Sequence, residues 1–217
     1  MRLSVDESSF FSSVKAGDVS SVVQALRPEP YLVNFQDEIG ETPLHLAVEN
    51  GFVEMVRVLI ANGAKIDIAD NKGNTPLNLA IAQCLALNGT HRENTIEIAN
   101  ILFESGIDVN FIDKDGFSSL HHATIMGDSE IMSFLVKKGA DVNCKSRSGY
   151  TPLLWGLCAN ILERDIQKHL DALEFLIKHG ADINATTNDG KSSLIVALEN
   201  NPGRPELGKL LQKHGAK

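Results

Sequence analysis

The chain has 217 residues, enough for one large domain or two small ones, and its 43% apolar content is typical of a folded protein. Its 28 acidic and 20 basic residues give a formal net charge of −8. This balance argues against a general binder of nucleic acid or anionic membranes, because both are polyanions. The three cysteines are odd in number and far apart, which predicts reduced thiols and a cytoplasmic location.

The first 36 residues predict two helices around a Gly-Asp turn, in the phrase SSFFSSVKAGDVSSVVQALRPEP. They contain no apolar run long enough for a signal peptide, and no stretch of the chain approaches the roughly 18 apolar residues that span a bilayer. We therefore expect no membrane insertion. The glycosylation sequons at Asn88 and Asn184 are expected to stay unmodified, since such a protein would not meet the glycosylation machinery.

Residues 37–69 predict two short helices followed by a hairpin. In ETPLHLAVENG, Thr42 is placed to accept hydrogen bonds from first-turn amides, Pro43 suits the first helical position, and Gly51 ends the helix. VEMVRVLIANG predicts the second helix, and AKIDIADNKGN predicts a short hairpin through its alternation and its Asp/Asn/Gly turn. Neither helix is long enough to be stable alone, so each is expected to pack against a neighbouring repeat.

The same unit recurs along the chain, marked by glycines spaced 33, 43, 33 and 41 residues apart at Gly40, Gly73, Gly116, Gly149 and Gly190. The two longer spacings predict insertions between the first and second helix, around Asn88 and Arg164. These insertions are either binding loops or solvated extensions. Beyond the first insertion, the next helix is expected to begin with Asn94 or Thr95 as its N-cap.

The period of 33, the phrase TPLHLA and the phrase GADVN agree in phase, and together they resemble the ankyrin repeat. The resemblance implies an all-α fold, an ankyrin-repeat α-solenoid of helix–turn–helix pairs joined by short β-hairpin loops. It predicts a single domain over 1–217. Its parts are an N-terminal capping repeat at about 1–36, repeats at 37–69, 70–112, 113–145 and 146–186, and a C-terminal capping repeat at 187–217, whose outer side carries Lys209, Lys213 and Lys217.

Catalytic and metal-binding patterns are missing from the sequence. In ankyrin repeats the histidine of the TPLH phrase typically bonds the backbone of adjoining hairpins, which implies a structural role for His45 and His121. Cys158 and His169 lie near one insertion, but no acidic residue is evident that would orient them for nucleophilic catalysis. Neither HExxH nor CxxC occurs. We therefore predict no catalytic residues, no metal and no cofactor.

Ankyrin repeats usually bind proteins with their hairpin tips and the exposed face of the first helix. On this resemblance, aromatic, apolar and charged residues of the third and fourth repeats are the candidate partner-binding residues: Phe111, Ile112, Lys114, Asp115, Phe117, Ile125, Met126, Arg147, Tyr150 and Trp155. Such a mixture is typical of an interface hot spot. An acidic first repeat is expected to help orient a basic element of the partner.

Trp155 also has an alternative role in the core. It stands where the repeat has Leu, and the next residue, Gly156, replaces the usual Ala, so the glycine is expected to make room for the indole. Asn110, Asn143 and Asn184 end phrases that resemble sites of an asparaginyl hydroxylase. The alternative for these asparagines is a hydrogen bond to the hairpin turn.

The sequence therefore predicts a monomeric, non-enzymatic protein–protein interaction module, an adaptor, inhibitor or scaffold. Two alternatives are an accessory or substrate-recruiting subunit of an enzyme complex, and a bacterial or viral effector that acts on a host protein. Because very many unrelated binders share this scaffold, the fold does not name the partner protein.

Overall fold

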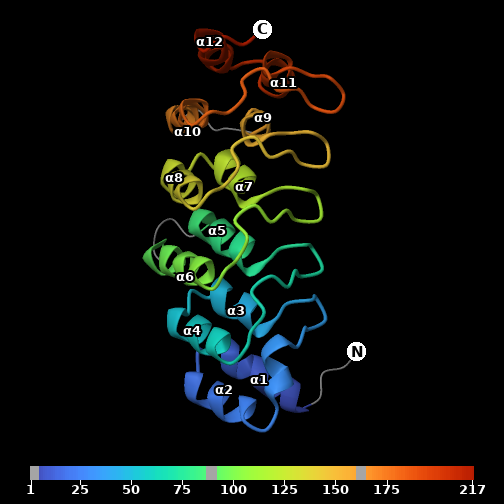
Figure 1. The fold of residues 1–217 in the computed structure, drawn as a ribbon, viewed down its shortest axis with the longest axis vertical. Helices are drawn as coiled ribbons and strands as arrows, with labels where there is room; N and C mark the ends of the chain where they lie inside the picture. The colour runs from blue at the N-terminus through green and yellow to red at the C-terminus, as the bar shows by residue number, and fades with distance from the viewer. Residues whose placement is uncertain (1–4, 87–91, 160–164) are drawn as a thin grey trace. The chain divides into compact units, whose positions relative to one another are not determined.

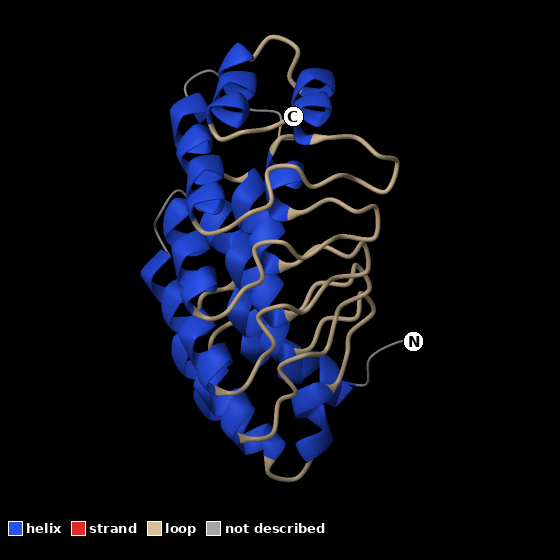
Figure 2. Cartoon of the chain, turned by 45° about the horizontal axis from the view of Figure 1, so that its top comes forward, coloured by secondary structure: helices blue, strands red, loops and turns tan. Residues whose placement is uncertain are grey.

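The computed structural model describes residues 5–86, 92–159 and 165–217 of the chain (Figure 1). All regular structure in these residues is helical, and Figure 2 draws no strand among them. The chain divides into two compact units, unit 1 at Met1–Asp108 and unit 2 at Val109–Lys217. The predicted insertion residues Asn88 and Arg164 lie outside the described residues.

Unit 1 is built from three successive helix pairs. Its elements are α1 (Val5–Lys15), α2 (Val19–Leu26), η1 (Pro30–Asn34), α3 (Pro43–Glu49), α4 (Val53–Ala61), α5 (Pro76–Ala86) and α6 (Arg92–Glu104). Within this unit α3 lies against α1, α4 and α5, and α4 lies against α2 and α6. The apolar side of each helix is therefore buried by a neighbouring pair, as the short, marginal helices require.

The start of α3 follows the predicted capping pattern. The Thr42 hydroxyl accepts a hydrogen bond from the backbone N–H of His45 at 3.4 Å, and Pro43 is the first helical residue. Gly51 follows the helix with a φ of 67°, a left-handed conformation that glycine adopts without a steric penalty. The helix boundaries expected for this repeat are confirmed.

The expected N-cap of α6 is wrong. The helix begins at Arg92, so Asn94 and Thr95 lie within its first turn. The Asn94 side chain donates a hydrogen bond of 3.1 Å to the carbonyl of Gly51, in the turn that precedes α4. Thr95 is buried. The Asn94 side chain therefore bonds to the preceding repeat, and neither residue is the N-cap of α6.

Unit 2 repeats the same plan with three further pairs. These are α7 (Ser119–Ile125) with α8 (Ser129–Lys137), α9 (Pro152–Gly156) with α10 (Ile166–Lys178), and α11 (Ser193–Asn200) with α12 (Pro205–Lys213). Within the unit α7 lies against α9, and α10 lies against both α8 and α12. The fully buried side chains Leu120, Ile131 and Met132 fill the first of these pairs.

The predicted hairpins are tight turns that contain at most one bridging pair. Backbone hydrogen bonds close them from Asp113 to Phe117 at 2.9 Å, from Ser146 to Tyr150 at 2.9 Å and from Thr187 to Lys191 at 3.1 Å. Isolated antiparallel bridges join Ile112 to Ser118 and Thr186 to Ser192.

Successive turns in unit 2 also stack on one another. The backbone N–H of Asn188 donates to the carbonyl of Ser148 at 3.1 Å, and its side chain donates to the carbonyl of Arg147 at 2.8 Å. A Cβ at Gly149 would collide with the backbone and side chain of Asn188. The shared glycine is therefore required both by its positive φ of 81° and by the close approach of the next turn.

Candidate functional site

The loop before α7 is held in place by a buried histidine. The Nδ1 atom of His121 accepts a hydrogen bond from the backbone N–H of Ser118 at 3.1 Å, and its Nε2 atom lies 2.9 Å from the carbonyl oxygen of Tyr150. Burial lowers the pKa of His121 to about 4, so the ring is neutral at physiological pH. In the neutral tautomer that fits both contacts, Nδ1 accepts and Nε2–H donates. The histidine thus ties the turn before α7 to the turn before α9.

Unit 1 contains the same arrangement at His45. Its Nδ1 atom accepts from the Thr42 backbone N–H at 3.1 Å, and its Nε2 atom lies 3.1 Å from the carbonyl oxygen of Asn74. Burial also lowers the pKa of this ring. The structural role that the repeat pattern implied for both histidines is therefore what the hydrogen bonds show.

Three aromatic rings meet where the two histidine-tethered turns adjoin α9, and we call them the aromatic cluster: Phe117, Tyr150 and Trp155. The ring centroids of Phe117 and Trp155 are 4.3 Å apart with the planes tilted by 31°. Tyr150 approaches Trp155 edge-on, with centroids 5.8 Å apart and an interplanar angle of 75°. Each residue is half-buried. The rings are therefore fixed by one another while part of each ring stays accessible to a partner.

Trp155 is neither fully exposed nor part of the closed core. Its indole nitrogen is buried and has no hydrogen-bond partner among the described residues. The expectation that Gly156 makes room for this indole stays a prediction. A Cβ at Gly156 would lie 2.7 Å from Leu173 Cδ2 and 2.8 Å from Thr124 Cγ2. Close packing against these two side chains of the same unit is therefore a further reason for a glycine at this position.

The remaining candidate residues surround the cluster with different degrees of exposure. Ile112 and Met126, at the two ends of the segment that carries Phe117 and α7, are 47% and 46% exposed. Phe111 and Ile125 are half-buried, and the charged residues Lys114, Asp115 and Arg147 are exposed. Ring contacts join Phe117, Tyr150 and Trp155 to one another, and Phe117 also contacts the rings of His121 and His122. The partner-binding role of the whole set stays a prediction.

A contact between a histidine and a carboxylate beside the cluster was not predicted from the sequence. The Nε2 atom of His122 lies 3.0 Å from one carboxylate oxygen of Asp113. The other oxygen of Asp113 accepts backbone N–H bonds from Asp115 at 2.9 Å and Phe117 at 2.8 Å. The Asp113 carboxylate therefore fixes the turn that carries Phe117, and the contact with His122 holds that carboxylate in position. The signal available in the sequence was a histidine at the position where Leu46 and Trp155 stand in other repeats.

The asparagines considered for hydroxylation connect the ends of successive second helices in unit 2. Asn110 donates to the carbonyl of Gly139 at 3.2 Å and accepts from the N–H of Asp141 at 2.8 Å. Asn143 repeats both bonds with Gly180 at 2.9 Å and Asp182 at 2.8 Å. Asn184 accepts from the N–H of Lys217 at 3.1 Å. These bonds give the side chains a structural role, and their modification stays a prediction.

Burial disfavours the thiolate form of the two cysteines of unit 2. Burial raises the pKa of the Cys158 thiol to about 11 and lowers the pKa of His169, whose Nε2 atom lies 2.9 Å from the carbonyl oxygen of Gly156. The Sγ atom of Cys144 lies 3.3 Å from the Ser118 hydroxyl and 3.8 Å from Nδ1 of His121, and burial raises its thiol pKa as well. A protonated thiol is a poor nucleophile. Across the described ranges no group of three metal-ligating side chains is found.

Comparison with known proteins agrees with this architecture. A family model described as ankyrin repeats (3 copies) matches residues 10–113 and 86–187. The chain belongs to the ankyrin-repeat family. Its fold is the ankyrin-repeat α-solenoid, and proteins of this family generally bind other proteins and are not catalysts. In the described part of the chain, no helix has the length and apolar character that crossing a membrane requires.

Individual relatives are similar over part of their length. A palmitoyltransferase of Lachancea kluyveri is 32% identical over 151 residues, which are 69% of this chain and 19% of that protein. NF-kappa-B inhibitor alpha of Sus scrofa is 36% identical over 127 residues, 57% of this chain and 38% of the inhibitor. A putative ankyrin repeat protein of Rickettsia felis is 32% identical over 147 residues, 67% of this chain and 45% of that protein. The chain thus spans less than half of each of these relatives.

Proposed function

We propose that the chain is a non-enzymatic protein-binding module, an adaptor, inhibitor or scaffold, whose main contact surface is the aromatic cluster of Phe117, Tyr150 and Trp155. The observation that carries the proposal is that three rings pack on one another and yet remain partly accessible. Aromatic side chains dominate interface hot spots. Rings that are already held in place lose little conformational freedom when a partner binds.

The two exposed apolar residues near the cluster, Ile112 and Met126, extend the apolar part of the proposed surface. Arg147, Lys114 and Asp115 supply charged side chains of both signs. This combination of an apolar centre with a charged border is the usual composition of a protein–protein interface. A partner is expected to place an apolar or aromatic side chain against the cluster.

Unit 1 differs in charge and supports a second, orienting role. Its 108 residues contain 7 basic and 15 acidic side chains, a net charge of −8. Burial and the charges of Glu49, Asp37 and Asp70 raise the pKa of Glu41, which shows how closely the carboxylates are grouped. We propose that this charge attracts a basic element of the partner and increases the association rate.

We propose that the chain acts in the cytoplasm of its own cell. Two alternatives to this role remain. Relatives include a palmitoyltransferase, an inhibitor of NF-kappa-B and a variola virus ankyrin repeat protein. An accessory or substrate-recruiting subunit and an effector acting on a host protein would both use the same surface.

The test is affinity capture from lysate followed by binding measurements with the purified candidate. Wild type is compared with a Phe117→Ala/Tyr150→Ala double variant and with Tyr31→Ala, a control that removes a 53% exposed aromatic ring from unit 1. We expect one captured protein to be lost with the double variant alone, and its purified form to bind at least about 100-fold more weakly, as expected for two hot-spot residues. Equal affinity for all three proteins would overturn the assignment of the surface.

A further inference from the structure

The first helix of the last pair, α11, presents two apolar side chains to solvent. Ile195 is 44% exposed and Leu198 is 65% exposed. Side chains at the same two positions of other repeats are buried, with exposures between 0% and 2%: His45 and Val48 in α3, His121 and Thr124 in α7, and Leu154 and Leu157 in and beside α9. In those repeats this face of the helix packs against the following repeat. On α11 it is open.

The turn before α11 has an open edge as well. A Cβ at Gly40 would approach Asn71 to 2.6 Å, whereas a Cβ at Gly190 would meet no atom within 4 Å. The carbonyls of Arg147 and Ser148 accept bonds from Asn188, the corresponding residue of the next turn. By position, the equivalent carbonyls in the last turn are those of Asn188 and Asp189. The turn before α11 and the exposed face of α11 are therefore both free of the contacts that the preceding turns and helices make with the next repeat.

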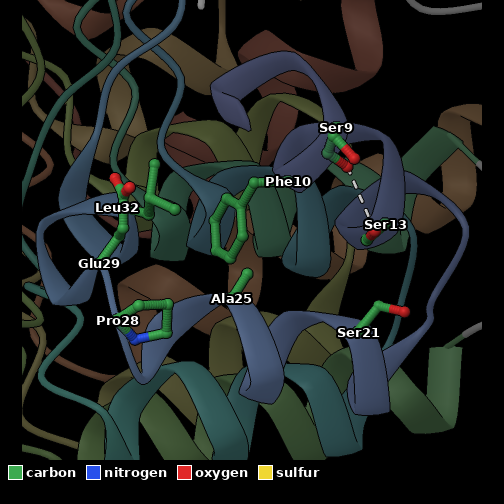
Figure 3. A pocket seen from close by; sticks show the side chains of 8 residues that line it. All are labelled: Ser9, Phe10, Ser13, Ser21, Ala25, Pro28, Glu29 and Leu32. Carbon is green, nitrogen blue, oxygen red and sulfur yellow. Dashed lines mark hydrogen bonds between the residues drawn. The ribbon is translucent and has the colours of Figure 1, made fainter. Parts of the chain in front are cut away.

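Unit 1 carries a groove on its surface. It lies between α1, α2 and η1, has a volume of about 400 Å³, and is lined by Ser9, Phe10, Ser13, Ser21, Ala25, Pro28, Glu29 and Leu32 (Figure 3). Along the groove α1 presents the small residues Ser9 and Ser13, whose side chains leave it open. It is therefore wide enough to receive a branched apolar side chain.

Position in the repeat relates the groove to Leu198. Ser13 occupies the position of Gly156 in α9, and Leu198 occupies the position of Thr124 in α7. Within unit 2 these two positions are in close contact, since a Cβ at Gly156 would lie 2.8 Å from Thr124 Cγ2. A large side chain on one repeat thus faces a small residue on the next. Leu198 and Ser13 stand at the two positions of this kind of contact, the large side chain on α11 and the small one on α1.

Charge favours the same pairing. Lys209 and Lys217 are exposed near α12, and Lys213 pairs with Glu174 at 3.2 Å, whereas Glu29 lines the groove and unit 1 carries a net charge of −8.

We propose that a second copy of this chain docks head-to-tail, with α11 of one molecule seated on the α1–α2 groove of the next. The contact uses a different surface from the aromatic cluster and does not depend on the proposed function. It also differs from the monomer expected from the sequence. Two exposed side chains bury far less area than a stable dimer requires, so the association is weak. Because the two contacting faces differ, each copy can bind another at either end and the assembly does not close as a dimer.

Sedimentation equilibrium from about 10 µM to about 1 mM tests the contact, because this range brackets weak association. Leu198→Gln is compared with Ile39→Gln, a control that removes a 55% exposed isoleucine from a loop of unit 1. We expect the average mass of wild type and Ile39→Gln to rise with concentration. The association constant of Leu198→Gln is expected to fall at least about tenfold. A wild-type chain that stays monomeric, or equal association of both variants, would overturn the proposal.

A mixing experiment tests the head-to-tail geometry. Ser9 is exposed, and Ser9→Glu places a charge in the groove without touching α11. Each variant is expected to associate poorly alone, whereas an equimolar mixture of Ser9→Glu and Leu198→Gln retains one intact contact and forms a one-to-one complex. Circular dichroism confirms that both variants are folded. A mixture that associates no better than its components contradicts the head-to-tail contact.

Discussion

The two units share a set of buried contacts and differ in what they expose. Each ties a turn to the next with a buried histidine, His45 in unit 1 and His121 in unit 2. Unit 1 has a net charge of −8, whereas unit 2 has 13 basic and 13 acidic residues and is neutral. Unit 2 alone carries the aromatic cluster. The repeat pattern therefore fixes the scaffold, while the partner chemistry is set by positions that the pattern leaves free.

The largest expected effect tests whether the histidine has the same role in both units. His45→Ala and His121→Ala each leave a buried backbone N–H, of Thr42 or Ser118, without its partner. Each also removes one of the two hydrogen bonds that the carbonyl of Asn74 or Tyr150 accepts. Each substitution is expected to lower the free energy of unfolding by roughly 2–4 kcal/mol. Urea unfolding followed by circular dichroism measures both. A small effect in one unit only would show that the buried histidine contributes differently to stability in the two units.

The next effect is specific to unit 2. Gly156→Ala introduces a methyl group 2.7 Å from Leu173 Cδ2, and this overpacking is expected to destabilise the protein by about 1–3 kcal/mol. The matched control is Gly208→Ala in α12, where no atom lies within 4 Å of the added Cβ. The control is expected to stabilise the protein by up to about 1 kcal/mol through helix propensity. Equal stability of the two variants would contradict the close packing around α9.

The pH dependence of unit 2 should follow His121. Its folded-state pKa of about 4 lies below the ordinary value of 6.5, so the unfolded state binds more protons between these pH values. Stability is therefore fully present above about pH 6.5 and falls as the pH is lowered towards 4. Trp155 is the single tryptophan of the chain, so its fluorescence reports unfolding of unit 2. His121→Asn, the residue found at this position as Asn78, should flatten the dependence.

The smallest effect belongs to the acidic unit 1. The raised pKa of Glu41 means that the folded state holds its proton more tightly than the unfolded state. The group therefore destabilises the folded unit above its folded-state pKa, and this loss disappears as the pH falls below the unfolded value. Glu41→Gln is expected to be more stable than wild type at pH 7 by about 0.5 kcal/mol or less, because solvent screens the charges. Thermal unfolding at pH 7 and at pH 3.5 measures the difference, which should vanish at the lower pH.

Repeat spacing and capping residues made most of the fold predictable. Thr42, Pro43 and Gly51 define the limits of α3 through local hydrogen bonds and backbone preferences. The predicted start and the predicted end of this helix were both correct. The start of α6 was wrong because Asn94 bonds to Gly51, a contact with another repeat that local pattern does not contain.

The sequence by itself determined the repeat register, the helix pairs and the set of candidate surface residues, because these depend on periodicity and on local capping. Only the tertiary structure decided that Phe117, Tyr150 and Trp155 form one cluster, that His122 pairs with Asp113, and that α11 leaves Ile195 and Leu198 uncovered. These features depend on which side chains of different repeats meet in space. Such meetings are set by packing between helices about 8–10 Å apart, and the order of residues along one helix does not specify them.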